Sequence, residues 1–276
     1  MKAKDLKNAE MRARYVARLL KGVKGTYKPA LKQTTPLFVA GWQRSGTTML
    51  MNIFHLHPDI EVYNEAYNSK VFTDFRIRNI EILTNTVKQS RFPVACYKII
   101  CDSHILDTFV EAFPEAKLIW MYRSAADNAE SHIRKFPHAT RAIKLVAQNQ
   151  PGGGWFAEGV GSEIAKRVRD IAKKDLTEFD YACLAWWVRN SLYFDLGLEK
   201  ASSVRVLQYE QLVKNPREIM KNVFDWVGLS WNEKVFKYVH SGSVGKPNLP
   251  SIDPEVAELC NGLKEKLDQE LIKDWK

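Results

Sequence analysis

The chain has 276 residues, a mass of 31.7 kDa, 45% hydrophobic and 26% charged residues, and a net charge of +9. This composition is ordinary for a soluble globular protein. No apolar run approaches the roughly 18 residues that cross a bilayer, and the first residues include no apolar segment typical of a secretory signal. We therefore expect a cytoplasmic protein whose cysteines (Cys96, Cys101, Cys183 and Cys260) stay reduced.

The positive charge is concentrated at the start of the chain. Residues 1–32 carry ten Lys/Arg and two acidic residues, a net +8, which leaves +1 for the rest. Apolar residues recur there at three- and four-residue steps, as in an amphipathic helix: Leu6, Ala9, Ala13, Val16 and Leu20. We expect residues 1–32 to form a basic helical segment docked by this stripe. Contact with an acidic partner, a membrane surface or nucleic acid is the alternative.

Strand-like and helical segments alternate through residues 33–276, which we expect to form one domain. The expected strands are 37–40, 94–100, 116–122 and 204–209. The expected helices are 47–57, 103–113, 123–136 and 176–195, with another that has Asn215 as N-cap, Pro216 at N1 and Glu218 in a capping box. This alternation predicts an α/β fold with a parallel β-sheet flanked by helices.

Two stretches interrupt the alternation. Residues 149–161 read NQPGGGWFAEGVG, and their glycine content predicts a mobile surface loop. Residues 241–250 read SGSVGKPNLP, a second loop that carries Lys246 among small residues. Neither stretch has the composition of a linker between domains, so both are interpreted as loops of the same domain.

The segment GWQRSGTT (Gly41–Thr48) has the spacing of a phosphate-binding loop between a strand and a helix. Loop N–H groups and the positive end of the helix dipole together bind an anion. Thr47 stands where nucleoside triphosphatases carry the lysine that reaches the terminal phosphates. The cation here is Arg44, inside the loop. This arrangement favours a ligand with one 5′-phosphate bearing a short charged group.

This loop resembles the 5′-phosphosulfate loop of the sulfotransferases that use 3′-phosphoadenosine 5′-phosphosulfate (PAPS). The residues that match are Arg44, Ser45, Gly46, Thr47 and Thr48. The next segment, MLMNIFHLHPDIEVYNEAYN, is similar to the carbohydrate and protein-tyrosine branches of that family. The resemblance covers roughly residues 36–247 and implies a P-loop-like sulfotransferase fold.

A second motif carries the same resemblance. Arg123 ends a predicted strand and Ser131 follows eight residues later, like the pair that grips the 3′-phosphate in this family. An arginine at the carboxyl end of a parallel strand faces the crevice where such sheets bind ligands, and a guanidinium clamps a phosphate through two hydrogen bonds. The resemblance further implies that Tyr209 packs near the adenine and that Lys246 closes over the 3′-phosphate.

The resemblance implies in-line transfer of the sulfuryl group from PAPS to a hydroxyl, or an amine, with release of adenosine 3′,5′-bisphosphate and no metal. Arg44 and Lys98 would neutralise charge on the leaving group and the sulfuryl oxygens. Glu65 matches the glutamate that serves as general base in the carbohydrate and tyrosine branches. His104 is the second candidate base, although its spacing from Lys98 differs from that of the cytosolic branch.

The acceptor pocket is expected to combine residues 60–75, 149–161 and 176–195. Its expected aromatic lining is Tyr63, Tyr67, Trp155 and Phe156. We expect a small-molecule acceptor (a metabolite, natural product or lipid headgroup) and no nucleic-acid partner. A P-loop kinase acting on a small acceptor is one alternative. A nucleotide- or nucleic-acid-binding module that uses the basic start of the chain is the other.

Overall fold

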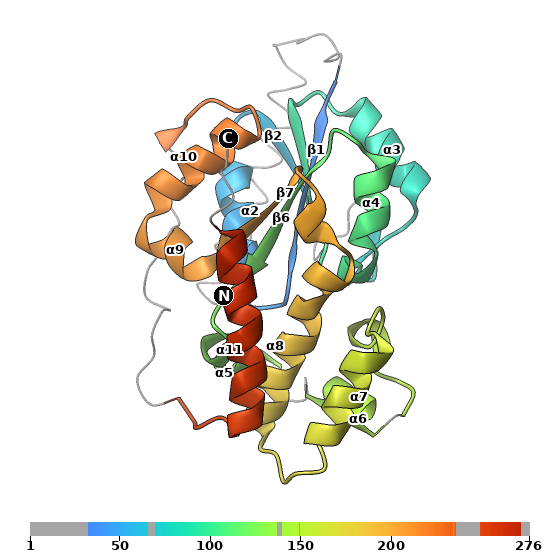
Figure 1. Ribbon diagram of the computed structural model, residues 1–276. Helices are drawn as coiled ribbons and strands as arrows, with labels where there is room; N and C mark the ends of the chain where they lie inside the picture. Colours follow the sequence, from blue (N-terminus) through green and yellow to red (C-terminus); the bar gives the residue numbers. More distant parts are fainter. Residues whose placement is uncertain are drawn as a thin grey trace, which may run out of the picture.

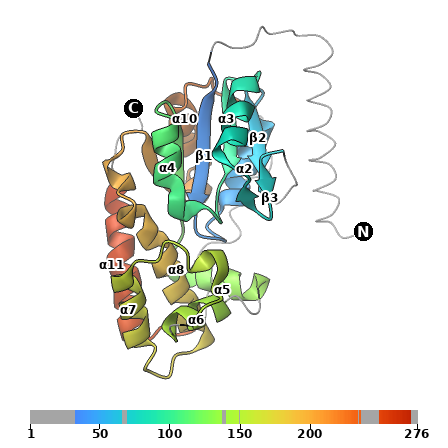
Figure 2. The same cartoon turned by 90° about the vertical axis from the view of Figure 1, so that its right-hand side faces the viewer.

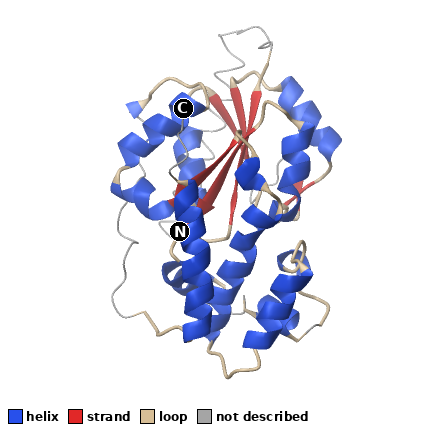
Figure 3. Cartoon of the chain, in the orientation of Figure 1, coloured by secondary structure: helices blue, strands red, loops and turns tan. Residues whose placement is uncertain are grey.

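A five-stranded parallel sheet forms the centre of the fold. The computed structural model describes residues 33–65, 70–136, 140–148, 150–233, 235 and 249–271. The sheet has the order β2-β5-β1-β6-β7, and Figure 3 shows its strands between helices on both sides. Its strands are β1 (Thr35–Gly41), β2 (Ile60–Asn64), β5 (Val94–Lys98), β6 (Lys117–Tyr122) and β7 (Val204–Gln208). The predicted α/β class is confirmed.

The sequence predicts four of these strands and misses β2. Strand β2 lies at the edge of the sheet, and only Ile60 among its residues is buried, so it lacks the apolar run that marks the central strands. Two strand ends differ from the prediction. Strand β5 ends at Lys98, and Tyr209 begins helix α9 (Tyr209–Lys214) instead of closing a strand.

Helices cover both faces of the sheet (Figure 1). One face packs against α2 (Thr47–Leu56), α9 and α10 (Pro216–Trp226). The other face packs against α3 (Ile80–Gln89), α4 (Leu106–Ala112), α8 (Glu178–Asp195) and α11 (Pro254–Glu270). Along β1 the buried side chains alternate between the two faces. Leu37 and Val39 pack on the side of α2, and Phe38 packs on the side of α8. Burial on both faces makes the central strands continuously apolar.

The remaining elements lie mainly at the end of the sheet toward which β1 runs (Figure 2). They are α5 (Ala125–Lys135), α6 (Arg141–Ala147), α7 (Ser162–Ile171) and the short 3-10 helix η2 (Gly154–Phe156). A small hairpin of β3 (Phe72–Thr73) and β4 (Arg76–Ile77), the turn η1 (Ser103–Ile105) and the turn η3 (Leu198–Lys200) complete the order. The sequence predicts α2, α4, α5, α8 and α10 but not α3, α6, α7, α9, α11 or the hairpin.

Two local predictions are wrong. Asn215 and Pro216 do occupy the N-cap and N1 of α10, but no side-chain cap hydrogen bond forms there. The backbone N–H of Asn215 already donates to the Gln211 carbonyl at 2.9 Å, because the same residue ends α9, so it has no donor left for Glu218. The glycine-rich stretch is not simply a surface loop, since Phe156 within it is 4% exposed.

Several predicted features lie outside the described residues, namely the basic segment 1–32, Tyr67 and Lys246. The extent of the domain, 33–276, therefore stays a prediction. Among the helices that the structure describes, none combines the length and apolarity that crossing a membrane requires.

Candidate active site

The register of the sheet brings the predicted site residues together at the carboxyl ends of its strands. Lys98, the last residue of β5, pairs with Val39 of β1 on one side and with Asn64 of β2 on the other. The phosphate loop therefore begins at Gly41, two residues after Val39, and Glu65 comes directly after Asn64. Arg123 follows β6, which pairs with β1 on its other side. The carboxyl ends of parallel strands are where open α/β sheets bind ligands.

The backbone of the phosphate loop requires glycine at two positions. Gly41 has φ 122°, and a Cβ there would lie 2.0 Å from the carbonyl oxygen of Met121 on the paired strand. Gly46, the N-cap of α2, has φ 92°, and its Cβ would lie 2.3 Å from the Tyr209 ring. Arg44 itself adopts φ 68°, a conformation that costs a residue with a side chain roughly 1–2 kcal/mol. The turn is thus held in a conformation that its surroundings must maintain.

Helix α5 supplies part of that support. The fully buried Asn128 amide donates to the Gln43 carbonyl at 2.9 Å and to Ser45 Oγ at 3.1 Å. One turn later, His132 Nε2 lies 3.3 Å from Gln43 Oε1, and its ring packs on Trp42 with 4.9 Å between centroids. Burial, reinforced by the charge of Arg44, lowers the pKa of His132 to about 4. Nothing in the sequence motif indicates either residue, because the contact joins segments far apart in the chain.

A cavity of about 320 Å³ opens between the phosphate loop, α5 and the start of α9. Its lining residues are Arg44, Gly46, Thr47, Thr48, Met49, Arg123, Glu130, Ser131, Arg134 and Tyr209. Both predicted phosphate motifs therefore face one space, and Arg44 Nε donates to Ser131 Oγ at 3.2 Å across it. Ser45 does not line the cavity, because its side chain is fully buried against Asn128.

Arg123 is held in place from several sides. Its guanidinium stacks over the Tyr209 ring at 4.8 Å and lies 3.8 Å from Asp127 and 3.9 Å from Glu210. Its backbone carbonyl accepts a hydrogen bond from Trp186 Nε1 at 2.9 Å. Trp186 thus belongs to the core and also anchors the strand end that carries Arg123. The arginine is 5% exposed, so its orientation is fixed by packing.

The cavity is electropositive. Among the described residues, the lining carries three guanidinium groups, from Arg44, Arg123 and Arg134, and one carboxylate, from Glu130. Burial lowers the pKa of Arg44, and the positive charges of Arg134 and Arg123 lower it further. Like charges gathered in this way favour an anionic ligand, since an anion relieves their repulsion.

Glu65 and Lys98 form a second cluster at the sheet edge. Glu65 Oε1 lies 3.1 Å from Lys98 Nζ, and Glu65 Oε2 accepts from the backbone N–H of Ile100 at 3.1 Å. Both side chains are largely buried, at 7% and 11% exposure. Burial raises the pKa of Glu65, and Lys98 opposes that rise. A carboxylate with a raised pKa beside a cation is suited to accept a proton near neutral pH.

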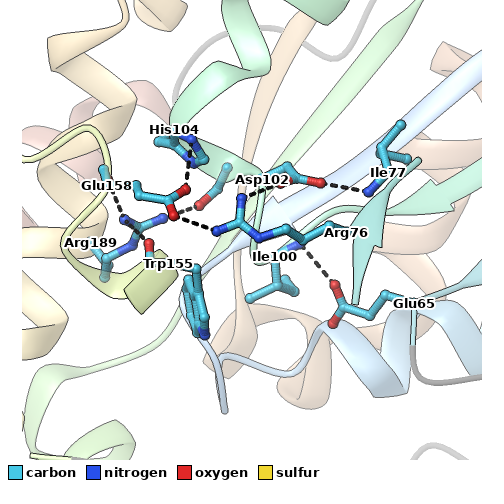
Figure 4. A network of polar contacts seen from close by, with 10 residues as sticks. Glu65, Arg76, Ile77, Ile100, Asp102, His104, Trp155, Glu158 and Arg189 are labelled. Carbon is cyan, nitrogen blue, oxygen red and sulfur yellow. Dashed lines mark hydrogen bonds and ion pairs between the residues drawn. The ribbon is translucent and has the colours of Figure 1, made fainter. Parts of the chain in front are cut away.

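His104 lies in a different network (Figure 4). Its Nε2 is 3.1 Å from Glu158 Oε2, while Arg76 bridges Glu158 at 2.6 Å and Asp102 at 3.0 Å. Burial lowers the pKa of His104. In Figure 4, His104 and Glu65 stand at opposite ends of the network, with Arg76 and Asp102 between them. The structure thus brings Glu65, and not His104, to Lys98.

Arg189 of α8 holds the glycine-rich stretch against this network. Its Nη1 donates to the carbonyls of Phe156 at 3.1 Å and Glu158 at 2.9 Å, and its Nη2 donates to Ser103 Oγ at 2.6 Å. Trp155 packs against Trp42 of the phosphate loop, with 5.6 Å between ring centroids and 44° between the ring planes. Trp42 is 3% exposed, so it packs in the core. Within the described part of the chain, no group of three His, Cys, Asp or Glu side chains could hold a metal ion.

Comparisons with known proteins agree with this geometry. Protein-tyrosine sulfotransferase 1 of Danio rerio is 25% identical over 218 residues, covering 76% of this chain and 57% of that protein. Protein-tyrosine sulfotransferase 2 of Gallus gallus is 22% identical over 255 residues, covering 88% and 64%. The chain thus spans about 57–64% of the length of these curated relatives.

A solved sulfotransferase domain from the curacin biosynthetic pathway has the same fold, with a TM-score of 0.52, 15% identity and coverage of 84% of this chain and 98% of that one. The family model described as the sulfotransferase domain matches residues 34–246, which include both phosphate motifs, Glu65 and Lys98. The chain is therefore a member of the sulfotransferase domain family.

Proposed function

We propose that this protein transfers the sulfuryl group of PAPS to a hydroxyl group of a small-molecule acceptor and releases adenosine 3′,5′-bisphosphate. One observation carries the proposal: the two predicted phosphate motifs line one electropositive cavity, and Arg44 and Ser131 meet there at 3.2 Å. A nucleotide with phosphates on both its 3′ and 5′ oxygens needs two anion sites that face one space.

The helices and strand ends that surround the cavity suggest which part of the donor each residue would bind. The N–H groups at the start of α2, with the hydroxyls of Thr47 and Thr48, would hold the 5′-phosphosulfate. Arg123 and Ser131 would hold the 3′-phosphate, and Tyr209, which lines the cavity beside Arg123, would pack near the base. The cavity fits such a ligand because its walls are cationic and its loop backbone has no room for a side chain at Gly46. Lys246, outside the described residues, stays a proposed contact.

PAPS would supply an activated sulfuryl group, and the chain's own residues would move the proton and stabilise charge. We assign the general base to Glu65, because burial raises its pKa and Ile100 and Lys98 orient its carboxylate. Lys98 and Arg44 would neutralise negative charge that develops during transfer. His104 stays the second candidate base, although Glu158 occupies its Nε2.

The acceptor class and location are part of the same proposal. We propose a metabolite, natural product or lipid headgroup as acceptor, no nucleic-acid partner, and a cytoplasmic location. The four cysteines are free and buried, which supports a reducing environment. Because the curated relatives are protein-tyrosine sulfotransferases, an acceptor screen should include a tyrosine peptide beside hydroxylated small molecules.

Ligand-dependent thermal stability tests the proposed donor. At 100 times its dissociation constant a ligand stabilises the fold by about 2.7 kcal/mol, which raises the melting temperature by about 5 °C or more. We expect that shift with adenosine 3′,5′-bisphosphate, a smaller one with adenosine 5′-phosphate, and none with ATP–Mg²⁺. Stabilisation by ATP–Mg²⁺ without the bisphosphate would indicate a kinase and overturn the proposal.

Arg123 variants locate the bound phosphate. Arg123→Ala should abolish the bisphosphate shift, and Arg123→Lys should reduce it, because lysine keeps the charge but not the two-pronged hydrogen bonding. Arg217→Ala is the matched control: it removes an arginine of α10 that is 70% exposed, pairs with Glu233 and does not line the cavity. A full shift in both Arg123 variants would place the bisphosphate elsewhere.

A further inference from the structure

Strand β2, which Glu65 follows, has few buried side chains. It is an edge strand that pairs with β5, and of its residues Ile60 alone is buried. Within the described part of the chain, the Glu65 carboxylate is held by Lys98 Nζ and the Ile100 N–H, which come from β5 and the residues just after it. The position of Glu65 therefore depends on how firmly the carboxyl end of β2 is held on β5.

Two tyrosine rings stack across this ladder, where Tyr63 of β2 is the partner of Tyr97 of β5. The ring planes are 8° from parallel, with 4.8 Å between centroids. The next pair in the ladder is Asn64 with Lys98. Tyr97 is fully buried and packs in turn on Phe38 of β1, with 6.0 Å between centroids. The stack thus joins the edge strand to the centre of the sheet, immediately before the pair that carries Lys98.

The rings of the two tyrosines, and not a hydrogen bond of Tyr97, explain this contact. Tyr97 Oη is buried and, among the residues that the structure describes, has no hydrogen-bond partner. A buried hydroxyl without a partner is destabilising, so the hydroxyl does not account for an aromatic residue at this position. A stacked aromatic pair does, because cross-strand ring contacts stabilise the pairing of neighbouring strands.

We propose that the Tyr63–Tyr97 stack positions the general base: it fixes the carboxyl end of β2 on β5 and so sets the geometry of the ion pair that Glu65 forms there. This inference rests on the proposed function and adds two positioning residues to it. A small displacement of a catalytic group lowers the rate strongly, because proton transfer requires hydrogen-bond distance to the acceptor. The stack should therefore affect kcat and leave donor binding unchanged, since neither tyrosine lines the donor cavity.

Steady-state kinetics of variants that lack one ring tests the stack. Tyr63→Leu and Tyr97→Leu should each lower kcat by about 10- to 100-fold, with KM for the acceptor and the dissociation constant of the bisphosphate near the wild-type values. Tyr97→Phe keeps the ring and removes the unpaired hydroxyl, so its kcat should match that of the wild type. Tyr63 is only half-buried, so Tyr63→Leu carries the test should Tyr97→Leu fail to fold. Wild-type kcat in Tyr63→Leu, or a change in KM alone, would overturn the inference.

The pKa of Glu65 gives a readout that does not depend on turnover. Lys98→Met should raise this pKa, because Lys98 lowers it in the wild type. If the stack sets the geometry of the ion pair, the same substitution in a Tyr63→Leu background should move the pKa by less than about half as much. Carboxyl ¹³C NMR measures both shifts. An equal shift in the two backgrounds would overturn the inference.

Phe113→Leu is the matched control. Phe113 ends α4, is 5% exposed in the same core and packs edge-on against Phe38, with 6.1 Å between centroids. The variant should destabilise the fold and keep the wild-type kcat and the wild-type pKa of Glu65. An equal loss of kcat in Phe113→Leu and Tyr63→Leu would overturn the inference, because any loss of core packing would then suffice. Failure of the wild type to bind the bisphosphate would overturn the proposed function, whereas the NMR comparison would still test the stack, since it needs neither donor nor acceptor.

Discussion

Glu65 and Lys98 form a buried ion pair, with 3.1 Å between Oε1 and Nζ, at the carboxyl ends of two neighbouring strands. The pairing of β2 with β5 places them there, because Asn64 and Lys98 are partners in the ladder. Burial raises the pKa of Glu65, and the charge and hydrogen bond of Lys98 partly offset that rise. The pair thus places a carboxyl group with a raised pKa beside a positive charge, at the carboxyl ends of the strands where the phosphate loop also begins.

Replacing Glu65 should remove the general base. We expect Glu65→Gln to lower kcat by about 10²- to 10⁴-fold while the dissociation constant of adenosine 3′,5′-bisphosphate changes little. The measurement is steady-state sulfation of an acceptor found by screening, with a parallel binding titration. Glu61→Gln is the control, since Glu61 lies on β2, the strand that Glu65 follows, but accepts from Ser90 Oγ at 2.7 Å. A Glu65→Gln enzyme with wild-type kcat would transfer the role to another residue, with His104 the next to test.

The raised pKa of Glu65 predicts the acid side of the pH–rate profile. The base acts as a carboxylate, so the rate falls as pH drops through the pKa of Glu65, and that fall should begin above the ordinary range of a glutamate. Lys98→Met removes the charge that lowers this pKa and should move it further upward. Carboxyl ¹³C NMR of wild type and Lys98→Met measures the shift without turnover. An unchanged or lower pKa in Lys98→Met would contradict the assigned pairing.

Asn128 should matter for both stability and donor binding. Asn128→Ala leaves the Gln43 carbonyl and Ser45 Oγ without this donor, at a cost of about 1–3 kcal/mol, and releases the Arg44 turn. We expect bisphosphate binding to weaken by about 10-fold, measured by calorimetry alongside urea unfolding. Asn79→Ala is the control: it removes the N-cap of α3 for about 1 kcal/mol but should leave binding unchanged. Equal binding in both variants would limit Asn128 to a structural role.

His132 should give the fold a measurable pH dependence. Its pKa of about 4 in the folded chain lies below the ordinary value, so the unfolded chain binds the proton first. The histidine therefore contributes stability that is present above about pH 6.5 and is lost as pH falls toward about 4. Urea unfolding at pH 7 and pH 4.5 should show that wild type loses about 2 kcal/mol more than His132→Gln. Equal losses would show that the ring protonates as readily in the folded state.

The phosphate loop was predictable from sequence because its function depends on contiguous residues. Arg44, Gly46 and Thr47 follow one another, and the conformation that gathers their N–H groups is set by the strand–loop–helix transition itself. Arg123 lies just before α5 and Ser131 lies within that helix, eight residues later, so one local element sets their spacing and the sequence shows it. Local geometry, which short-range sequence encodes, determined these parts of the site.

Tertiary structure alone decided how the parts meet. The order β2-β5-β1-β6-β7 depends on crossovers, which no local pattern reveals, and it brings Glu65 to Lys98 and leaves His104 with Glu158. Asn128 has no sequence signal, because its contacts with Gln43 and Ser45 join segments more than 80 residues apart in the chain. Residue identity was sufficient where a function resides in one turn of backbone. Where a function depends on two side chains from distant segments, the tertiary fold sets the distance between them.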